Sequence, residues 1–123
     1  MYTLNKKDIV AFNQEAGEKG LLNNESSLDF ALSLAKTKKN WLYELSYLTR
    51  SLLVDDVFVD GNKRTCLLTI IYFLEKNKKE YDREKLTPLI KKIAKNSITN
   101  PLMIMRLIHN VIREENKTTS RQK

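Results

Sequence analysis

Few residues in this sequence can support redox or histidine chemistry, because it holds one cysteine and one histidine among 123 residues. The single Cys66 excludes an internal disulfide and any cysteine-based zinc site, and its apolar neighbours favour a buried, inert thiol. His109 has no second histidine with which to form a metal site, so we interpret it as a surface or packed residue. Three glycines and two prolines leave few turns and favour long helices.

Long hydrophobic runs are also missing. The longest apolar run, from Cys66 to Leu74, is interrupted by Thr69 and is far shorter than the ~20 residues that a membrane-spanning helix needs. The first residues alternate between polar and apolar, unlike a secretory leader. We therefore expect a cytoplasmic protein that makes no membrane contact.

The chain is long enough for one hydrophobic core. Apolar residues recur at spacings of three and four in several segments, and no strand pattern stands out. The segment 62–76 is apolar nearly all round, which predicts a central helix buried on several sides. The predicted fold class is therefore all-α, a single-domain bundle of about six helices around a buried central helix. We place this helical domain at residues 1–113 and a polar tail at 114–123, and we leave open a short β-flap near residues 37–40.

Residues that cap helices precede the apolar segments. The predicted caps are Asn5 (with Asp8), Ser26 (with Asp29), Asn40, Asp82 and Asn100. Pro101 fits the first turn of the last helix. Pro88, in contrast, predicts a break or a restart inside the fifth helix.

Charged residues are concentrated in the segment 56–65, between two apolar helical segments. Gly61 can adopt backbone angles closed to other residues and lets a ligand approach the main chain. The helix predicted to begin at Asn62 presents unpaired amides and a favourable dipole to an anion. Lys63 and Arg64 add full positive charges, and Arg64 can bind two phosphate oxygens at once.

Two carboxylates complete this candidate site. Asp56 and Asp60 supply hard oxygens suited to Mg²⁺, which usually takes one or two carboxylates together with substrate phosphates. Cationic groups, a metal ligand and a potential base are the components that phosphoryl or nucleotidyl transfer needs. A polar connection between two helices explains the same residues without any function, and the spacing is not that of a Walker loop.

The same segment resembles the signature of the Fic/Doc (Fido) superfamily, His-x-Phe-x-Asp/Glu-Gly-Asn-Gly/Lys-Arg. The matching positions are Phe58, Asp60, Gly61, Asn62, Lys63 and Arg64. The lysine followed by Arg-Thr is closer to the Doc (death-on-curing) toxin branch. Fic members usually carry glycine at that lysine position and a second arginine at the position of Leu67. The chain length and the apolar helices on both sides of the motif also suit a Doc toxin.

The resemblance implies a role for each motif residue in binding ATP and Mg²⁺. Asp60 is implied to bind Mg²⁺, while Asn62 and Arg64 are implied to contact phosphates next to Gly61. Lys63 is implied to help occupy the anion pocket, which the resemblance links to phosphoryl transfer more than to AMP transfer. Lys63 and Arg64 are therefore predicted as catalytic as well as nucleotide-binding residues.

The resemblance also implies partners. Doc-type proteins belong to toxin–antitoxin systems and transfer a phosphoryl group from ATP to a protein hydroxyl, the expected substrate being translation elongation factor Tu. The expected inhibitor is a separate antitoxin whose disordered tail folds onto the toxin domain. Phe58 is implied to pack into the core and fix the loop.

One position departs from the family. Asp56 stands where the family has the histidine that removes the proton from the acceptor hydroxyl. Aspartate is the base in protein-kinase loops, but its reference pKa of about 3.9, against about 6.5 for histidine, makes it the weaker base. Three interpretations stay open. Asp56 is the catalytic base, it joins Asp60 as a metal ligand, or it marks a catalytically inactive Fic-fold module that binds a nucleotide or a partner.

Net charge gives a further indication. The chain carries +7, and most of the excess lies between residues 61 and 95. A positive field attracts ATP or an acidic protein, and it also attracts nucleic acid without sequence preference. Because a solvated lysine-rich surface explains most of these residues, a basic nucleic-acid binder is the weakest of the three functional interpretations.

Overall fold

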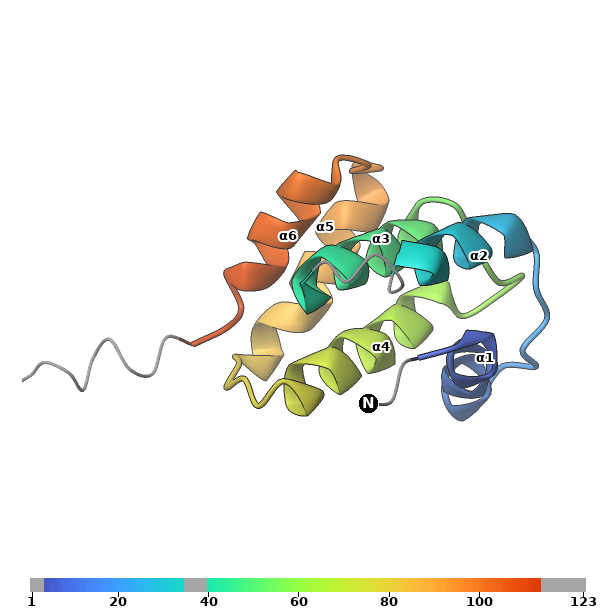
Figure 1. The fold of residues 1–123 in the computed structure, drawn as a ribbon, viewed down its shortest axis with the longest axis horizontal. Helices are drawn as coiled ribbons and strands as arrows, with labels where there is room; N and C mark the ends of the chain where they lie inside the picture. Colours follow the sequence, from blue (N-terminus) through green and yellow to red (C-terminus); the bar gives the residue numbers. More distant parts are fainter. Residues whose placement is uncertain (1–3, 35–39, 114–123) are drawn as a thin grey trace, which may run out of the picture.

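Six α-helices and one 3₁₀ turn make up the described part of the chain, residues 4–34 and 40–113 of a computed structural model (Figure 1). The helices are α1 (Lys6–Glu15), α2 (Glu25–Ser33), α3 (Trp41–Leu53), α4 (Asn62–Lys76), α5 (Leu86–Lys95) and α6 (Pro101–His109), and the 3₁₀ turn η2 spans Arg83–Lys85. No β-strand occurs within these residues, which hold two isolated antiparallel bridges. The all-α prediction is therefore confirmed.

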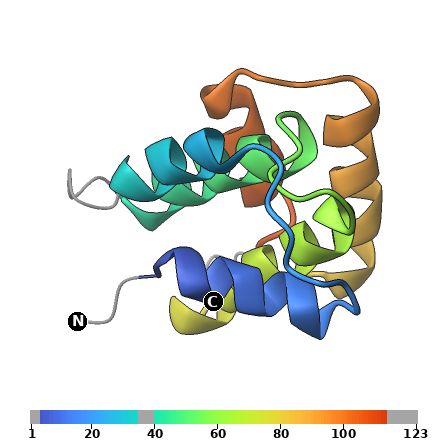
Figure 2. The ribbon, with the colours of Figure 1, turned by 90° about the vertical axis from the view of Figure 1, so that its right-hand side faces the viewer.

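Two helices share the centre of the bundle. α3 contacts α2, α4, α5 and α6, whereas α4 contacts α1, α3 and α5. Figure 2 shows α5 standing along one side of the molecule, with α1 lying below α2 and α3. Both central helices bury several large side chains completely, among them Leu45, Leu48, Leu52, Ile70 and Leu74. The predicted burial of α4 on several sides is confirmed, and α3 has an equally central place.

Three of the predicted helix caps are confirmed. Asn5 accepts a hydrogen bond from the Asp8 backbone N–H, and the Asp8 carboxylate accepts one from the Asn5 N–H in return. The Asn40 side chain accepts from the backbone N–H of Tyr43 at 2.8 Å. Asn100 accepts from the second residue of α6, directly after Pro101. These local signals define the starts of α1, α3 and α6.

Ser26 is not the cap of the second helix, so that prediction is wrong. α2 begins earlier, at Glu25, and its cap is Asn24, whose side chain accepts from the backbone N–H of Ser27. The Ser26 hydroxyl instead donates to the Asn24 side chain at 3.2 Å. Asn24 and Ser26 both belong to residue types that favour the cap position, and the earlier of the two caps the helix.

Asp82 does not cap the fifth helix with its side chain. Its carboxylate accepts from Arg113 at 2.7 Å and lies 3.3 Å from the Lys85 ammonium, and η2 separates Asp82 from α5. Pro88 causes no break, because it lies in the first turn of α5, where a backbone N–H has no partner within the helix.

Two predictions lie outside the described residues. The possible β-flap near residues 37–40 falls on an undescribed segment except for Asn40, the cap of α3. The predicted polar tail at 114–123 lies outside as well. Across the described residues, no helix is both long enough and apolar enough to cross a bilayer.

The thiol of Cys66 is fully buried in α4, as its apolar neighbours predicted. Burial raises the pKa of this thiol from its ordinary value of 9.0 to about 12, because the interior disfavours the charged thiolate. The folded protein therefore keeps the thiol proton at a pH where the unfolded chain has already released it.

We predict that this difference lowers the free energy of unfolding as pH rises above 9.0, and that the loss continues until about 12. Below pH 9.0 the contribution of the thiol is fully present, because both states hold the proton. Urea unfolding at a series of alkaline pH values checks this, with Cys66→Ala as the comparison. The variant should lose stability less steeply with pH, and parallel curves for the two proteins would contradict the prediction.

Candidate functional site

The loop that joins α3 to α4 is held in place by the segment before α2. Leu22 and Phe58 form an antiparallel bridge, and the backbone N–H groups of Asn23 and Asn24 both donate to the Val57 carbonyl, at 2.7 and 3.0 Å. The side chain of Asn23 donates to the Asp56 carbonyl at 3.0 Å. The chain thus follows a fixed path before it reaches the motif residues.

A second set of contacts joins residues within the loop itself. The Asn62 side chain accepts from the Phe58 backbone N–H and donates to the Phe58 carbonyl, each at 2.9 Å. Phe58 is 1% exposed, in agreement with its implied core position. Both polar atoms of the Asn62 amide are therefore engaged within the loop, and this fixes the orientation of the side chain at the start of α4.

Gly61 adopts a left-handed conformation, with φ of 80°, and is the residue from which α4 begins. A Cβ at this position would lie 2.5 Å from Cγ of Glu18 and 3.2 Å from Nδ2 of Asn13. Other residues are therefore disfavoured here by both backbone strain and contact. Gly61 offers no side chain to cap α4, which leaves the first amides of the helix without a side-chain cap.

The motif residues meet in one open groove of about 350 Å³ at the head of α4. Its lining residues are Leu53, Asp56, Val59, Asp60, Gly61, Asn62, Lys63, Arg64 and Ala94. All the site residues predicted from the sequence belong to this set. Two carboxylates and two cations thus surround a common space, with apolar walls from α3 and α5.

Arg64 also has a contact outside the groove. Its Nη1 donates to the carbonyl of Ala16, the C-cap residue directly after α1, at 2.8 Å. A cation at the carboxyl end of a helix is favoured by the helix dipole. Because a guanidinium has five N–H donors, this bond orients the side chain and leaves other donors for a ligand. Lys63 is exposed and adds a second cation from the same turn of α4.

Asp56 lies on the groove with an unusual backbone. Its φ is 51°, in the left-handed region that aspartate tolerates better than most residues. Its carbonyl is fixed by Asn23 and its side chain is exposed. Asp56 therefore offers a carboxylate to the groove from an anchored main chain.

Asp56 and Asp60 are the candidate metal ligands of the groove. Within residues 4–34 and 40–113, no cluster of three or more His, Cys, Asp or Glu side chains forms a complete metal site. Asp56 and Asp60 line the same groove. Two carboxylates with substrate phosphates and water are a usual environment for Mg²⁺. Asp60 remains the predicted ligand.

One residue of the site was not predicted from the sequence. Asn13 of α1 is fully buried and makes three hydrogen bonds. Its Nδ2 donates to the Asp60 carbonyl at 2.9 Å and to the Thr65 hydroxyl at 3.0 Å. Its Oδ1 accepts from the Gly20 backbone N–H at 2.7 Å. A signal was present, since Asn13 follows Ile9 by one turn and occupies an apolar position of α1.

A smaller hollow of about 150 Å³ lies next to the same loop. Its lining residues are Asn13, Glu18, Lys19, Leu21, Val59 and Asp60. Val59 and Asp60 line both hollows, so this pair forms a wall between them.

No protein-family model and no curated protein sequence matches this chain. The resemblance to the Fic/Doc superfamily therefore stays a prediction that depends on the motif residues, with support from the chain length and the flanking apolar helices.

We predict that Asn13→Ala lowers the free energy of unfolding by about 2–4 kcal/mol, since it removes three hydrogen bonds and leaves buried partners unsatisfied. Asn23→Ala is the matched control, because this exposed amide makes one hydrogen bond. Its cost should be about 1 kcal/mol or less. Urea unfolding measures both values, and equal costs would show that the Asn13 contacts do not support the site.

Proposed function

We propose that the groove at the head of α4 binds ATP with Mg²⁺ and transfers a phosphoryl group, or AMP, to a protein hydroxyl, as in a Doc-like toxin. The observation that carries the proposal is the meeting of the predicted residues in one groove of about 350 Å³. Cationic side chains and uncapped helix amides there suit a triphosphate. The carboxylates suit the accompanying metal ion.

Four of the groove residues bind the nucleotide and its metal ion in the proposed reaction. Lys63 and Arg64 bind the phosphate oxygens, where negative charge is spread in the transition state. Asp60 holds Mg²⁺, which supplies charge neutralisation when bound. Gly61 leaves room for the phosphates to approach the backbone.

In this proposal, Asp56 accepts the proton of the acceptor hydroxyl. The acceptor oxygen forms a bond to the γ-phosphorus while the bond to ADP breaks, and the hydroxyl proton passes to the Asp56 carboxylate. In AMP transfer the same oxygen attacks the α-phosphorus and pyrophosphate leaves. The protein substrate under this proposal is a translation factor such as elongation factor Tu, and the regulator is a separate antitoxin.

A second candidate function, a nucleotide-binding or partner-binding module without catalysis, is favoured by one observation. The residue at the position of the family base is an aspartate on an anchored, left-handed backbone. Its side chain is shorter than that of histidine and has less reach toward an acceptor hydroxyl. The nucleotide-binding form of this module differs from the enzyme only in that no transfer follows binding, whereas the partner-binding form needs no nucleotide.

We predict that Lys63→Gln and Arg64→Gln each weaken binding of ATP–Mg²⁺ by about tenfold or more, through loss of a charged phosphate contact. Asp60→Asn should weaken binding when Mg²⁺ is present and have little effect when it is absent. Lys79→Gln is the control, because Lys79 is exposed and follows the far end of α4. Isothermal calorimetry measures these affinities. Absence of heat with the unaltered protein, or an equal loss in Lys79→Gln, contradicts nucleotide binding in the groove.

We predict transfer of radiolabel from ATP to purified elongation factor Tu, with γ-labelled and α-labelled ATP separating phosphoryl from AMP transfer. Asp56→His restores the family base and should raise the rate, because an imidazole is the stronger base near neutral pH. Transfer by the unaltered protein supports the enzyme, and transfer by Asp56→His alone supports the inactive module. If neither protein labels this substrate although both bind ATP, the proposed substrate is wrong.

A further inference from the structure

The α5–α6 hairpin has an unusual charge distribution. Between Leu86 and Arg113 the sequence contains no aspartate and no glutamate, although the whole chain carries 15 of them. Every charged residue of this stretch is a cation or the single histidine. The hairpin therefore has no carboxylate of its own to balance its positive charges.

The cations of α5 lie together on its solvent side. Leu86, Leu89, Ile90 and Ile93 bury the other side of the helix. Lys91 and Lys95 are one turn apart and therefore share a face, and Lys92 lies beside them. All three lysines are exposed, and no carboxylate among the described residues pairs with them.

Apolar side chains are exposed on the neighbouring helix. Leu102 is 64% exposed and Met103 is 42% exposed, both in the first turn of α6. α5 and α6 contact each other and lie side by side (Figures 1 and 2). The hairpin thus offers unpaired ammonium groups and exposed apolar side chains on adjacent helices. Residues 96–100 join the last turn of α5 to the first turn of α6, which brings these side chains to the same end of the hairpin. We call Lys91, Lys92, Lys95, Leu102 and Met103 together the hairpin face.

We propose that the hairpin face docks an acidic protein segment that also carries apolar side chains. Carboxylates of the partner complement the three lysines, and its apolar residues cover Leu102 and Met103. Ala94, between two of these lysines in sequence, lines the groove at the head of α4. α5 therefore contributes residues both to the hairpin face and to the edge of that groove. The proposal does not depend on the transfer reaction, because it concerns binding without ATP.

Composition favours a protein over a nucleic acid. The stretch from Leu86 to Arg113 contains no phenylalanine, tyrosine or tryptophan on which a base could stack. Its α5 cations are lysines, which bind as point charges, and they lack the planar fork by which arginine binds phosphate in two contacts. Exposed leucine and methionine side chains gain nothing from a solvated phosphodiester backbone, but they gain from contact with apolar side chains.

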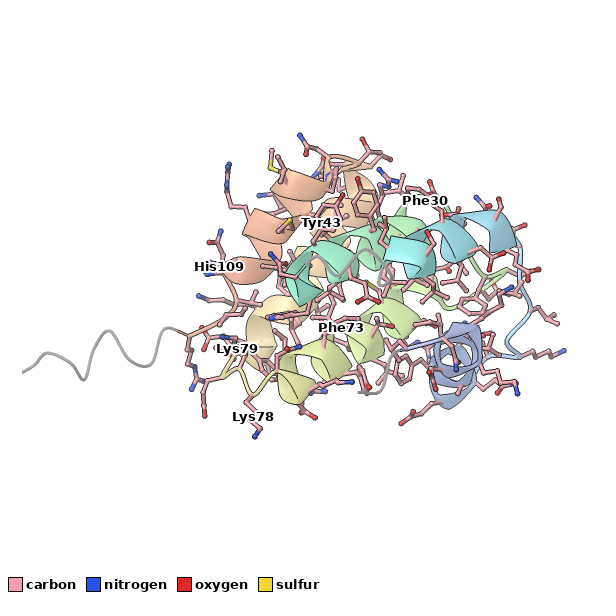
Figure 3. The ribbon with its side chains drawn as sticks, viewed as in Figure 1. Phe30, Tyr43, Phe73, Lys78, Lys79 and His109 are labelled. Carbon is pink, nitrogen blue, oxygen red and sulfur yellow. The ribbon has the colours of Figure 1, made fainter. Side chains whose placement is uncertain are left out.

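The test uses a fluorescent helical peptide with glutamates on one face and leucines on the other, titrated into the full chain and followed by anisotropy. Lys91→Gln/Lys95→Gln should weaken binding by roughly five- to tenfold, and its affinity should depend less on salt. The control is Lys78→Gln/Lys79→Gln, which makes the same change in charge. These lysines lie at the end of α4, as Figure 3 shows, and are also exposed. The control should change the affinity by less than about twofold.

A third variant examines the apolar part of the face. Leu102→Ser should weaken binding of the peptide, whereas a peptide with serines in place of its leucines should bind the unaltered protein and this variant equally. Equal losses in the two lysine pairs would show long-range attraction without a defined surface and would overturn the proposal. Tighter binding to duplex DNA or to vesicles containing phosphatidylglycerol than to the peptide would overturn it as well. Circular dichroism confirms that each variant is folded.

Discussion

The buried amide of Asn13 is the contact on which the position of the motif loop depends. Through it, α1 is joined to the Asp60 carbonyl, to the first turn of α4 at Thr65, and to the chain before α2 at Gly20. A buried amide that loses its partners is costly, so these segments hold one another in place. The Arg64 contact to the end of α1 strengthens the same connection. α1 is therefore part of the site, although none of its residues belongs to the motif.

The polar residues of the motif have two different structural roles. The Asn62 side chain is used within the loop, where it satisfies both backbone groups of Phe58. The charged side chains of Asp56, Asp60 and Lys63 are exposed on the groove and make no such internal contact in the described structure. An amide suits the first role because it both donates and accepts. Ionised groups suit the second because their field acts on a charged ligand.

The sequence predicted those features whose causes lie within a few residues. α4 begins and ends where its pattern indicated, since Gly61 and the apolar run are local signals. Asn5 and Asn40 cap their helices for the same reason. Asp82 could not be assigned correctly, because its carboxylate is held by Arg113, 31 residues further along the chain.

In the candidate site, too, the sequence predicted contacts between residues close together in the chain and did not predict contacts between distant ones. Its charged residues are neighbours in sequence, so their meeting in one groove was predictable. The contacts of Asn13 join residues 47 and 52 positions apart, and no local pattern reveals such pairs. The apolar walls contributed by Leu53 and Ala94 depend on how α3 and α5 pack, and this is a property of the whole bundle.

The backbone at Asp56 has an evolutionary consequence. Its left-handed angles are ones that aspartate, asparagine and histidine adopt more readily than other non-glycine residues. The codons of aspartate and histidine differ only in their first base. A lineage could therefore exchange one for the other in a single mutational step, without rebuilding the loop.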